Sequence, residues 1–531
     1  MIYSVYHRPH WIAAIERLRE VRGWEPVYLF SDQSEPVSLR AAFPNVTIHN
    51  VWDAWRGLPA PGREHLASRA FDAVDVRRYE RSLGAFLAIS VRGDSRGTFS
   101  CRDQQRLYRS QLMYWTGVVE DTKPDLVVFH DSPHSPHEFV LYLVCREAGV
   151  PTLFFQRTPL DGYCLLLDRI DALPIGLEPG ADERDSEIEP RLAAYLARLR
   201  GEYQDALPDY MRVQAERVRR QRPLRIVRDR FPEFALRSMK AVLRFWRWPD
   251  YIRRMLSPLW AFVTNSGHVP WMGQRLKPPR QTYASGARMS YREWLGERRY
   301  ARRYGEALAH YYESVALAPD LGAHPYVYVP LHYQPERTTA PDGGAFTDQW
   351  LMVNLIAAAV PDSWMVYVKE HPSQVSGDGD LEAYRGRAPH DYDEFLQLPN
   401  VRVVSQRVSS FDLADGAVAT ATVTGTAGWE SIVRGKHALV FGNAWYRWAR
   451  GAHHIQGKGD IERALDDIVD QPVVESDAAR SACLTVQSIG FRLDPRGGMG
   501  LPEGMSDDEN VDALVRALST AFDARNRGGQ P

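Results

Sequence analysis

The chain has 531 residues and a formal net charge of −2, and 44% of its residues are hydrophobic and 25% charged. This length is too great for one hydrophobic core, so we expect two or three domains, with the composition of an ordinary soluble globular protein. Four widely spaced cysteines without a Cys-x-x-Cys pair argue against a disulfide framework or a zinc site, and no apolar run approaches the ~20 residues of a membrane-spanning helix.

Short apolar segments alternate with helical patterns over residues 1–170. The first segment starts the chain and lacks the apolar core of a signal peptide, so we expect a cytoplasmic protein. Apolar strands without polar alternation, separated by helices, indicate a parallel sheet buried on both faces. Residues 1–170 are therefore predicted to form a Rossmann-like domain, which would hold the acceptor. Its expected strands are "MIYSVY", "EPVYLFSD", "VTIHNVW", "PDLVVFHD" and "VPTLFFQ".

Two carboxylates follow predicted strands of this domain. Asp161 lies beyond "VPTLFFQ", and Asp131 ends "PDLVVFHD". A carboxylate in such a place could deprotonate an acceptor hydroxyl or attack an anomeric carbon, although Asp-Gly is also a common turn pair. Asp161 is the first choice for this catalytic role and Asp131 the second. His134 and His137 resemble metal ligands, but no cysteine or third histidine follows at ligand spacing, so no metal is predicted.

A basic segment separates the two α/β regions of the chain. Residues 171–320 are expected to form a helical insertion, and residues 212–254 within it carry fourteen Arg or Lys against four acids, a net charge of +10. Residues 234–262 interleave aromatic and aliphatic side chains with Arg and Lys, which suits a helix lying in a membrane interface. We therefore expect residues 212–262 to make peripheral contact with an anionic membrane.

Other readings of this basic segment stay open. It could form a solvated basic face packed on the acidic remainder of the chain, or a groove for an anionic polysaccharide. Nucleic acid is not an expected partner, because no recognition motif accompanies the charge.

A second region with the same alternation begins near residue 321. Residues 321–510 are predicted to form a C-terminal Rossmann-like domain that binds a nucleotide sugar, and residues 511–531 a C-terminal helix with a polar tail. Two such domains facing a cleft would bind a ligand at the carboxyl ends of their strands. The expected strands are "HPYVYVPLHY", "SWMVYVKEHP", "VRVVS", "GAVATATVTG" and "HALVFG".

The stretch "VTGTAGWESIVRG" has the pattern of an anion-binding loop. A strand runs into small residues and a helix follows, so the first helical N–H groups could receive a phosphate. Thr424 or Thr426 could cap the helix, and Glu430 could accept the two hydroxyls of a ribose. A plain capped helix without a ligand is the alternative. The residues expected to bind nucleotide here are Thr424, Gly425, Thr426, Ala427, Gly428 and Glu430.

The stretch "VYVKEHP" ends a strand with Lys369, Glu370, His371 and Pro372. In a Rossmann-like domain this end would lie beside the loop at 424–428 and line the same cleft. His371, if protonated, could bind a phosphate and neutralise charge on a departing nucleotide, and Pro372 would fix the direction of the imidazole. We therefore predict a catalytic role for His371 and nucleotide contacts for its three neighbours.

The loop "PLHYQPERTTAPDGG" follows another strand of the same domain. Polar loops on a rigid scaffold often carry function, and Arg337 suits a phosphate or carboxylate clamp. We expect Gln334, Arg337 and Thr338 to contact the nucleotide sugar, with an exposed connector as the alternative.

The C-terminal half resembles the bacterial capsule polysaccharide biosynthesis proteins, which include retaining Kdo transferases and are distantly similar to bacterial sialyl- and polysialyltransferases. The resemblance covers roughly residues 322–446 and rests on "PLHYQPERTT", "VYVKEHP" and "TVTGTAGWESIVRGKHALVFGNAWY". The "DGY" at 161–163 is similar to the acidic-acidic-Gly motif of those families, with Leu160 at the first acidic position. The resemblance implies a GT-B fold, a CMP-activated 2-keto sugar acid as donor, and no metal or other cofactor. It implies that His371-Pro372 and residues 424–428 bind the CMP.

These observations predict a cytoplasmic GT-B-like glycosyltransferase of surface-polysaccharide or related glycan assembly. It would transfer a sugar such as Kdo or a sialic-acid-like sugar from a CMP-activated donor to a glycan or a lipid-linked acceptor. A UDP-sugar transferase or 2-epimerase on the same fold is one alternative. A non-catalytic capsule assembly or export factor that keeps the fold is the other.

Overall fold

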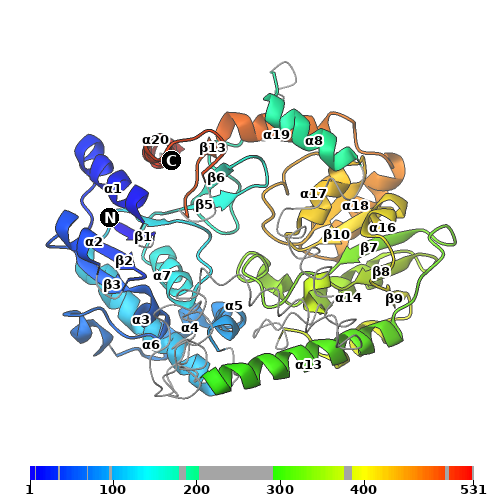
Figure 1. The fold of residues 1–531 in the computed structure, drawn as a ribbon, viewed down its shortest axis with the longest axis horizontal. Helices are drawn as coiled ribbons and strands as arrows, with labels where there is room; N and C mark the ends of the chain where they lie inside the picture. Colours follow the sequence, from blue (N-terminus) through cyan, green and yellow to red (C-terminus); the bar gives the residue numbers. More distant parts are fainter. Residues whose placement is uncertain are drawn as a thin grey trace, which may run out of the picture.

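Two α/β units lie side by side in a computed structural model of the protein (Figure 1). Each unit contains its own mainly parallel sheet, so the predicted GT-B-like fold class with two Rossmann-like units is confirmed. The basic segment at 212–262 lies outside the described residues. The structure describes residues 1–5, 8–33, 36–68, 70–94, 99–178, 187–201, 291–375, 386–496 and 501–528.

The first sheet has seven strands in the order β13-β6-β5-β4-β1-β2-β3. The pairs from β3 to β5 are parallel, as predicted, whereas β6 and β13 join antiparallel at one edge. The strand β6 was missed because its "YCLLL" follows β5 after a short turn with no helix between. The strands are β1 (Ile2–Ser4), β2 (Tyr28–Ser31), β3 (Thr47–Asn50), β4 (Val127–Phe129), β5 (Thr152–Arg157), β6 (Tyr163–Leu167) and β13 (Phe491–Arg492). The helices before residue 201 are α1 (Pro9–Arg22), α2 (Val37–Ala42), α3 (Val51–Trp55), α4 (Ala73–Tyr79), α5 (Leu83–Ser90), α6 (Cys101–Thr122), α7 (Pro136–Glu147) and α8 (Pro190–Arg200).

The second sheet has six strands in the order β12-β11-β10-β7-β8-β9, and all of its pairs are parallel. Counted from β7, this is the 3-2-1-4-5-6 order of a Rossmann sheet, whose direction of winding reverses between the first and fourth strands, here β7 and β10. The strands are β7 (Tyr326–Pro330), β8 (Met365–Lys369), β9 (Val401–Val403), β10 (Ala419–Thr422), β11 (His437–Val440) and β12 (Ala452–His454). The helices of this part are α13 (Tyr291–Val315), α14 (Gln349–Ala359), α15 (Pro389–Leu396), α16 (Ser410–Gly416), α17 (Thr426–Val433), α18 (Lys458–Asp470), α19 (Ala478–Ile489) and α20 (Asp507–Gly528).

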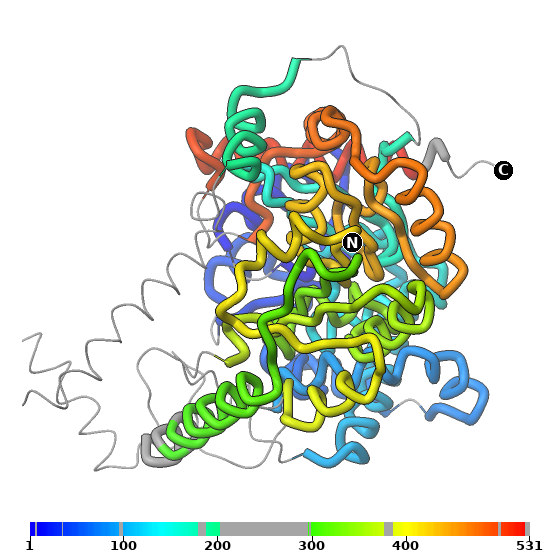
Figure 2. Tube along the Cα trace, turned by 90° about the vertical axis from the view of Figure 1, so that its right-hand side faces the viewer, coloured from blue at the N-terminus to red at the C-terminus, as the bar shows by residue number. Residues whose placement is uncertain are grey.

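Both faces of the second sheet are buried, which explains why central strands such as β7 and β8 have no polar alternation. In β7, Val327 and Val329 point into a core shared with α14 and α18, while Tyr326 and Tyr328 point to the other face, where α16 packs. Helix α13 lies beside α15 at the edge of this unit and appears in green in Figure 2.

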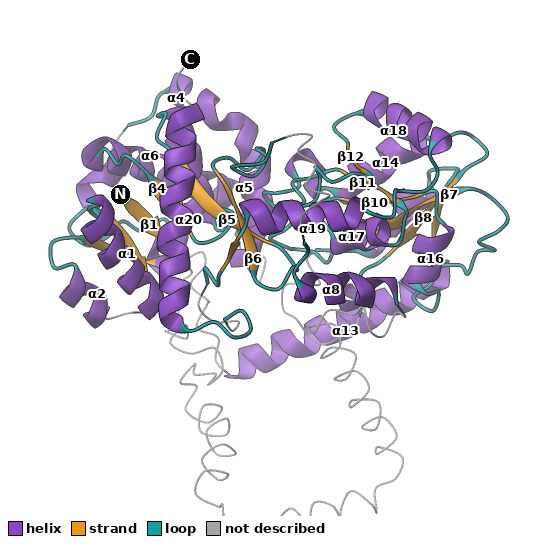
Figure 3. Ribbon diagram, turned by 90° about the horizontal axis from the view of Figure 1, so that it is seen from above, coloured by secondary structure: helices purple, strands orange, loops and turns teal. Residues whose placement is uncertain are grey.

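The chain returns to the first unit near its end. Strand β13 pairs with β6, and α20 packs along α1 (Figures 1 and 3). Phe522 of α20 meets Trp24 edge to face with ring centroids 5.0 Å apart, and Arg17 and Arg22 of α1 pair with acids of α20. The chain has therefore already rejoined the first sheet before residue 510, where the sequence placed a domain boundary.

Helix length and hydropathy show whether a helix could span a membrane. None of the helices in the described part of the chain combines the length and apolar character that a bilayer crossing requires.

Candidate functional site

A cavity of about 250 Å³ opens at the carboxyl ends of β7, β8 and β10. It lies where the winding of the sheet reverses, the place where ligands bind in open α/β sheets, and we call it the switch-point cavity. Of the residues predicted to bind or act on a nucleotide sugar, those that line it are Thr338, Lys369, Glu370, His371, Pro372, Thr424, Gly425, Thr426, Ala427 and Glu430.

Helix α17 begins at this cavity without a side-chain cap. Its N-cap is Gly425, whose own N–H donates to the Thr422 hydroxyl at 3.0 Å. The Thr424 hydroxyl donates to the Thr338 carbonyl at 2.8 Å, so it ties two loops together instead of capping the helix as predicted. The first N–H groups of α17 are thereby left for a ligand, and the partial positive charge of the helix start favours an anion.

Gly428 packs closely against a neighbouring segment, and its predicted contact with a nucleotide stays a prediction. It does not line the cavity, and a Cβ at this position would collide with the Tyr446 hydroxyl. That hydroxyl donates to the Gly425 carbonyl and so holds the loop before α17. A residue without a side chain is needed here because two segments approach closely.

His371 is oriented by its own neighbours in the chain. Its Nδ1 accepts the Ser373 N–H at 3.2 Å, and its backbone N–H donates to the Glu370 carboxylate at 2.7 Å. Burial lowers the pKa of His371 below its ordinary value, although Glu370 and Glu336 act in the opposite direction. The ring is therefore neutral at pH 7, with its proton on Nε2, and it can donate a hydrogen bond without the protonation that we expected.

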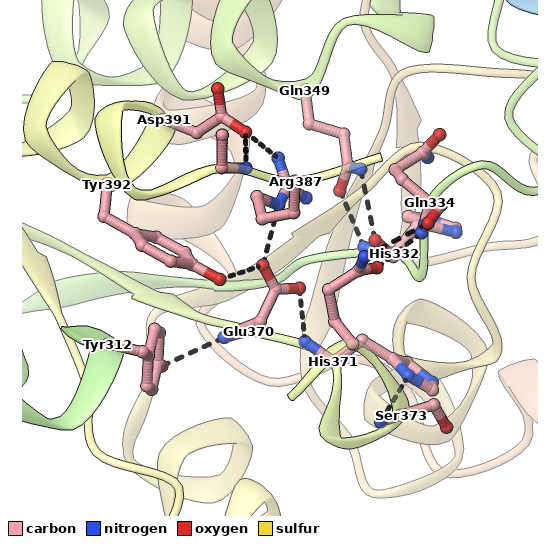
Figure 4. A network of polar contacts seen from close by, with 12 residues as sticks. Tyr312, His332, Gln334, Gln349, Glu370, His371, Ser373, Arg387, Asp391 and Tyr392 are labelled. Atoms are coloured by element: carbon pink, nitrogen blue, oxygen red, sulfur yellow. Dashed lines mark hydrogen bonds and ion pairs between the residues drawn. The ribbon is translucent and has the colours of Figure 1, made fainter. Parts of the chain in front are cut away.

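The Glu370 carboxylate supports His371 and points toward Arg387 and Tyr392 (Figure 4). Its carboxylate accepts from the Arg387 Nε at 2.7 Å and from the Tyr392 hydroxyl at 2.9 Å, in addition to the His371 N–H. Both Glu370 and Arg387 are buried. With its oxygens occupied in this way, Glu370 has the contacts of a positioning residue, and its predicted contact with a nucleotide stays a prediction.

Lys369 is buried at the end of β8 and holds the loop that leads to α16. Its Nζ donates to the Val408 carbonyl at 2.6 Å and to the Ser410 hydroxyl at 2.9 Å. Burial lowers the pKa of Lys369 to about 8. The ammonium group keeps a third N–H for a ligand in the cavity.

Gln334 holds its own loop in place rather than reaching the switch-point cavity. Its backbone N–H donates to the Gln374 side chain at 2.7 Å, and its backbone carbonyl accepts from the same side chain at 3.1 Å. Its own amide donates to the Thr339 hydroxyl at 2.9 Å. The predicted contact of Gln334 with the nucleotide sugar finds no support in this geometry.

A second cavity, of about 90 Å³, lies between the two units, and we call it the interdomain cavity. Asp131 of the first unit lines it together with Arg337 of the second, and the two side chains form an ion pair. Asp131 also pairs with Arg496 at 2.6 Å and accepts the Ser132 N–H at 2.9 Å. Arg337 thus clamps a carboxylate of the protein, and its contact with the nucleotide sugar stays a prediction.

The two cavities are neighbours, because Thr338 and Thr424 line both. The interdomain cavity also contains Asp342, which sequence reasoning missed. Burial raises the pKa of Asp342 to about 7, while a hydrogen bond from Ser132 at 2.7 Å acts in the opposite direction. The "PDGG" stretch around Asp342 predicts only a turn, because the residues that bury Asp342 belong to the other unit.

Asp161, the first choice for the acceptor-side carboxylate, lines neither cavity. It sits in the turn between β5 and β6 and forms ion pairs with Arg191 at 3.2 Å and Arg492 at 3.0 Å. Its φ of 38° is the left-handed conformation that Asp tolerates in turns. A catalytic role for Asp161 stays a prediction, and of the two carboxylates Asp131 has the better position.

The described residues contain no group of three or more His, Cys, Asp or Glu side chains that could hold a metal ion. Whether the protein works without a metal stays a prediction.

Three solved structures illustrate what the chain is similar to. A beta Kdo 2,7 transferase, KpsC of Thermosulfurimonas dismutans, is 12% identical with a TM-score of 0.23, over 43% of this chain and 66% of that one. A UDP-GlcNAc 2-epimerase from Methanocaldococcus jannaschii is 10% identical with a TM-score of 0.22, over 92% and 99% of the two chains. An alpha,alpha-trehalose-phosphate synthase (UDP-forming) from Burkholderia vietnamiensis is 11% identical with a TM-score of 0.25, over 99% of both. The chain thus spans slightly under two thirds of the KpsC chain, and the fold assignment above rests on strand order and not on these matches.

Sequence comparison adds a narrower result. No curated protein matches the chain. Residues 340–451, which include His371 and the start of α17, match the family model described as capsule polysaccharide biosynthesis protein, and this confirms the resemblance that the motifs of the C-terminal half suggest.

Proposed function

We propose that this protein is a glycosyltransferase of surface-polysaccharide or related glycan assembly, with a CMP-activated 2-keto sugar acid such as Kdo or a sialic-acid-like sugar as donor. The observation that carries the proposal is the switch-point cavity, where the Nε2–H of His371 and the uncapped start of α17 converge. Both are hydrogen-bond donors suited to a phosphate. The family model over residues 340–451 supports a role in capsule polysaccharide synthesis.

The nucleotide is proposed to lie on the second unit. The phosphate would accept from the N–H groups at the start of α17 and from His371, and the Glu430 carboxylate would accept from the ribose hydroxyls. As the bond between the anomeric carbon and the phosphate oxygen breaks, negative charge grows on that oxygen. Donors already fixed in place stabilise this charge without reorganisation, which is why we propose a reaction that needs no metal.

The acceptor is proposed to enter from the first unit. Because Thr338 and Thr424 line both cavities, a sugar attached to a phosphate at α17 would extend toward the interdomain cavity. A glycan or lipid-linked hydroxyl would approach it there, beside Asp131.

Nucleotide-dependent melting and product formation test the proposal. A ligand present at 100 times its Kd stabilises a protein by about 2.7 kcal/mol, so CMP should raise the melting temperature and a CMP-sugar should yield a glycosylated product. Stabilisation by UDP alone, with a UDP-sugar product or an epimerised sugar, would indicate the UDP-sugar transferase or 2-epimerase instead. Absence of product with every donor would indicate a non-catalytic assembly or export factor.

A further inference from the structure

Asp342 differs from Asp131 in how many partners its carboxyl has. Asp131 accepts from two guanidinium groups and a backbone N–H. In the described part of the chain, the Ser132 hydroxyl is the only hydrogen-bond donor to the Asp342 carboxyl. Asp342 lines the interdomain cavity and is half-buried. An oxygen of Asp342 is therefore left for a molecule that enters this cavity, whereas Asp131 is occupied.

The groups around Asp342 come from both units. The Asp131 carboxylate raises the proton affinity of Asp342, and the Arg337 and Arg92 guanidinium groups lower it. His134 contributes no charge at neutral pH, because burial lowers its pKa to about 3. The other charged side chains at this site are Arg157, which lines the cavity, and Arg496, which pairs with Asp131.

We propose that Asp342 is the general base that takes the proton of the acceptor hydroxyl. This inference rests on the proposed function. In the step, the acceptor O–H bond breaks and its proton moves to Asp342, while the acceptor oxygen forms a bond to the anomeric carbon. The bond from that carbon to the phosphate oxygen breaks, and its electron pair leaves with CMP.

The chemistry of Asp342 suits this role. A base is most effective when its pKa lies near the working pH, because it is then both mostly deprotonated and strongly basic. Burial raises the pKa of Asp342 to about 7, which meets that condition. Asp131 is held by Arg337 and Arg496 and has a different role. Its ion pair with Arg337 holds the loop that carries Asp342, and its negative charge raises the pKa of Asp342.

Asp342→Asn tests the proposal because it keeps the shape and the hydrogen bond from Ser132. With a hydroxyl acceptor, turnover should fall by about 10²–10⁴-fold, the usual contribution of a positioned base. The fall of the wild-type rate below about pH 7 should disappear, while CMP should still raise the melting temperature. With azide as acceptor, an anion that has no proton to lose, the variant and the wild type should react at similar rates. Asp362→Asn, at an exposed carboxyl of the same unit, is the matched control and should behave like the wild type.

If Asp342→Asn and Asp362→Asn turn over a hydroxyl acceptor at equal rates, the proposal is overturned. It is also overturned if Asp342→Asn loses as much turnover with azide as with a hydroxyl acceptor. If Asp342→Asn does not fold, Ser132→Ala replaces it. Loss of that hydrogen bond should move the acidic limb of the rate profile to higher pH, and an unmoved limb would overturn the role of Asp342. A wild-type protein that transfers no sugar to any acceptor, azide included, would refute the proposed function itself, which is a different result.

Discussion

His371 is held by two residues close to it in the chain, one through its imidazole ring and one through its backbone. The Ser373 N–H fixes the lone pair of Nδ1, and the Glu370 carboxylate fixes the backbone of His371. Glu370 is in turn held by Arg387 and Tyr392. The direction of the Nε2–H is therefore set before any nucleotide arrives, which is the preorganisation that stabilisation of a leaving group requires.

Removal of this donor should slow the reaction more than it weakens the fold. His371→Ala should lower turnover by about 10²–10⁴-fold, because the departing phosphate loses a positioned hydrogen-bond donor. Steady-state kinetics with the best CMP-sugar measure this change, and the thermal shift with CMP should become smaller. His390→Ala, at an exposed histidine of the same unit, is the control and should keep wild-type turnover. A folded His371→Ala protein with normal turnover would show that His371 does not act on the leaving group.

Asp342 should make stability depend on pH in a defined direction. Its pKa is about 7 in the folded state against an ordinary 3.8, so the folded protein holds this proton more tightly than the unfolded chain. The stability that this provides is complete below about pH 3.8 and is lost as the pH rises through 7. The melting temperature of Asp342→Asn minus that of the wild type should therefore be larger at pH 8 than at pH 5.

Differential scanning fluorimetry at the two pH values measures this difference. Asp362→Asn should follow the wild type at both, since Asp362 is exposed. A difference that stays constant, or that shrinks toward pH 8, would contradict a raised pKa for Asp342.

At the scale of elements, α17 packs closely against Tyr446 at Gly428. Alanine is normally better than glycine inside a helix by about 1 kcal/mol. At Gly428, however, the new methyl group would meet the Tyr446 hydroxyl. Gly428→Ala should lower the free energy of unfolding by about 1–3 kcal/mol, as overpacking of a tight interior does.

Urea denaturation measures this effect, and Gly459→Ala is its control. Gly459 lies exposed in α18, and a methyl group there would meet nothing closer than the far end of Arg463 at 3.6 Å. It should leave stability unchanged or raise it slightly. Equal stability changes in the two variants would mean that Tyr446 moves aside without cost.

Some of these elements could be predicted from the sequence and others could not. A strand such as β8 is an apolar run that ends shortly before a proline, a pattern set by local sequence. The edge strand β13 pairs with β6 through residues that are far apart in the chain, such as Phe491 with Cys164, and no local pattern reports such a partner.

The residues of the site also divide into those that local sequence patterns predict and those that they do not. His371 and the residues around Thr424 end strands of one unit, so strand order brings them together. The raised pKa of Asp342 arises from burial and from the Asp131 carboxylate of the other unit, and the sequence around Asp342 shows only a turn.

For the whole molecule, charge predicts an association that lies outside the described residues. Residues 212–254 carry a net charge of +10, and 234–262 add aromatic and aliphatic side chains. We propose that this segment docks the protein on an anionic membrane, where each Lys or Arg contributes about 1 kcal/mol. Such docking would bring the interdomain cavity to a lipid-linked acceptor.

Co-sedimentation with liposomes tests this proposal. The wild type should sediment with vesicles that contain anionic lipid, and less so at high salt. A variant with Arg244, Arg247, Arg253 and Arg254 all changed to Glu should stay in the supernatant. Equal binding of both proteins, or none by either at low salt, would rule out the membrane role.

The packing of α20 on α1 has a consequence for how the protein folds during its synthesis. A ribosome releases the first unit long before it makes residues 507–528, yet these residues cover the apolar side of α1. Until residues 507–528 have been synthesised, Trp11, Ile15 and Leu18 of α1 lack part of the apolar cluster that surrounds them in the folded protein. A chain truncated before residue 507 would therefore expose apolar side chains of this cluster and would be prone to aggregate.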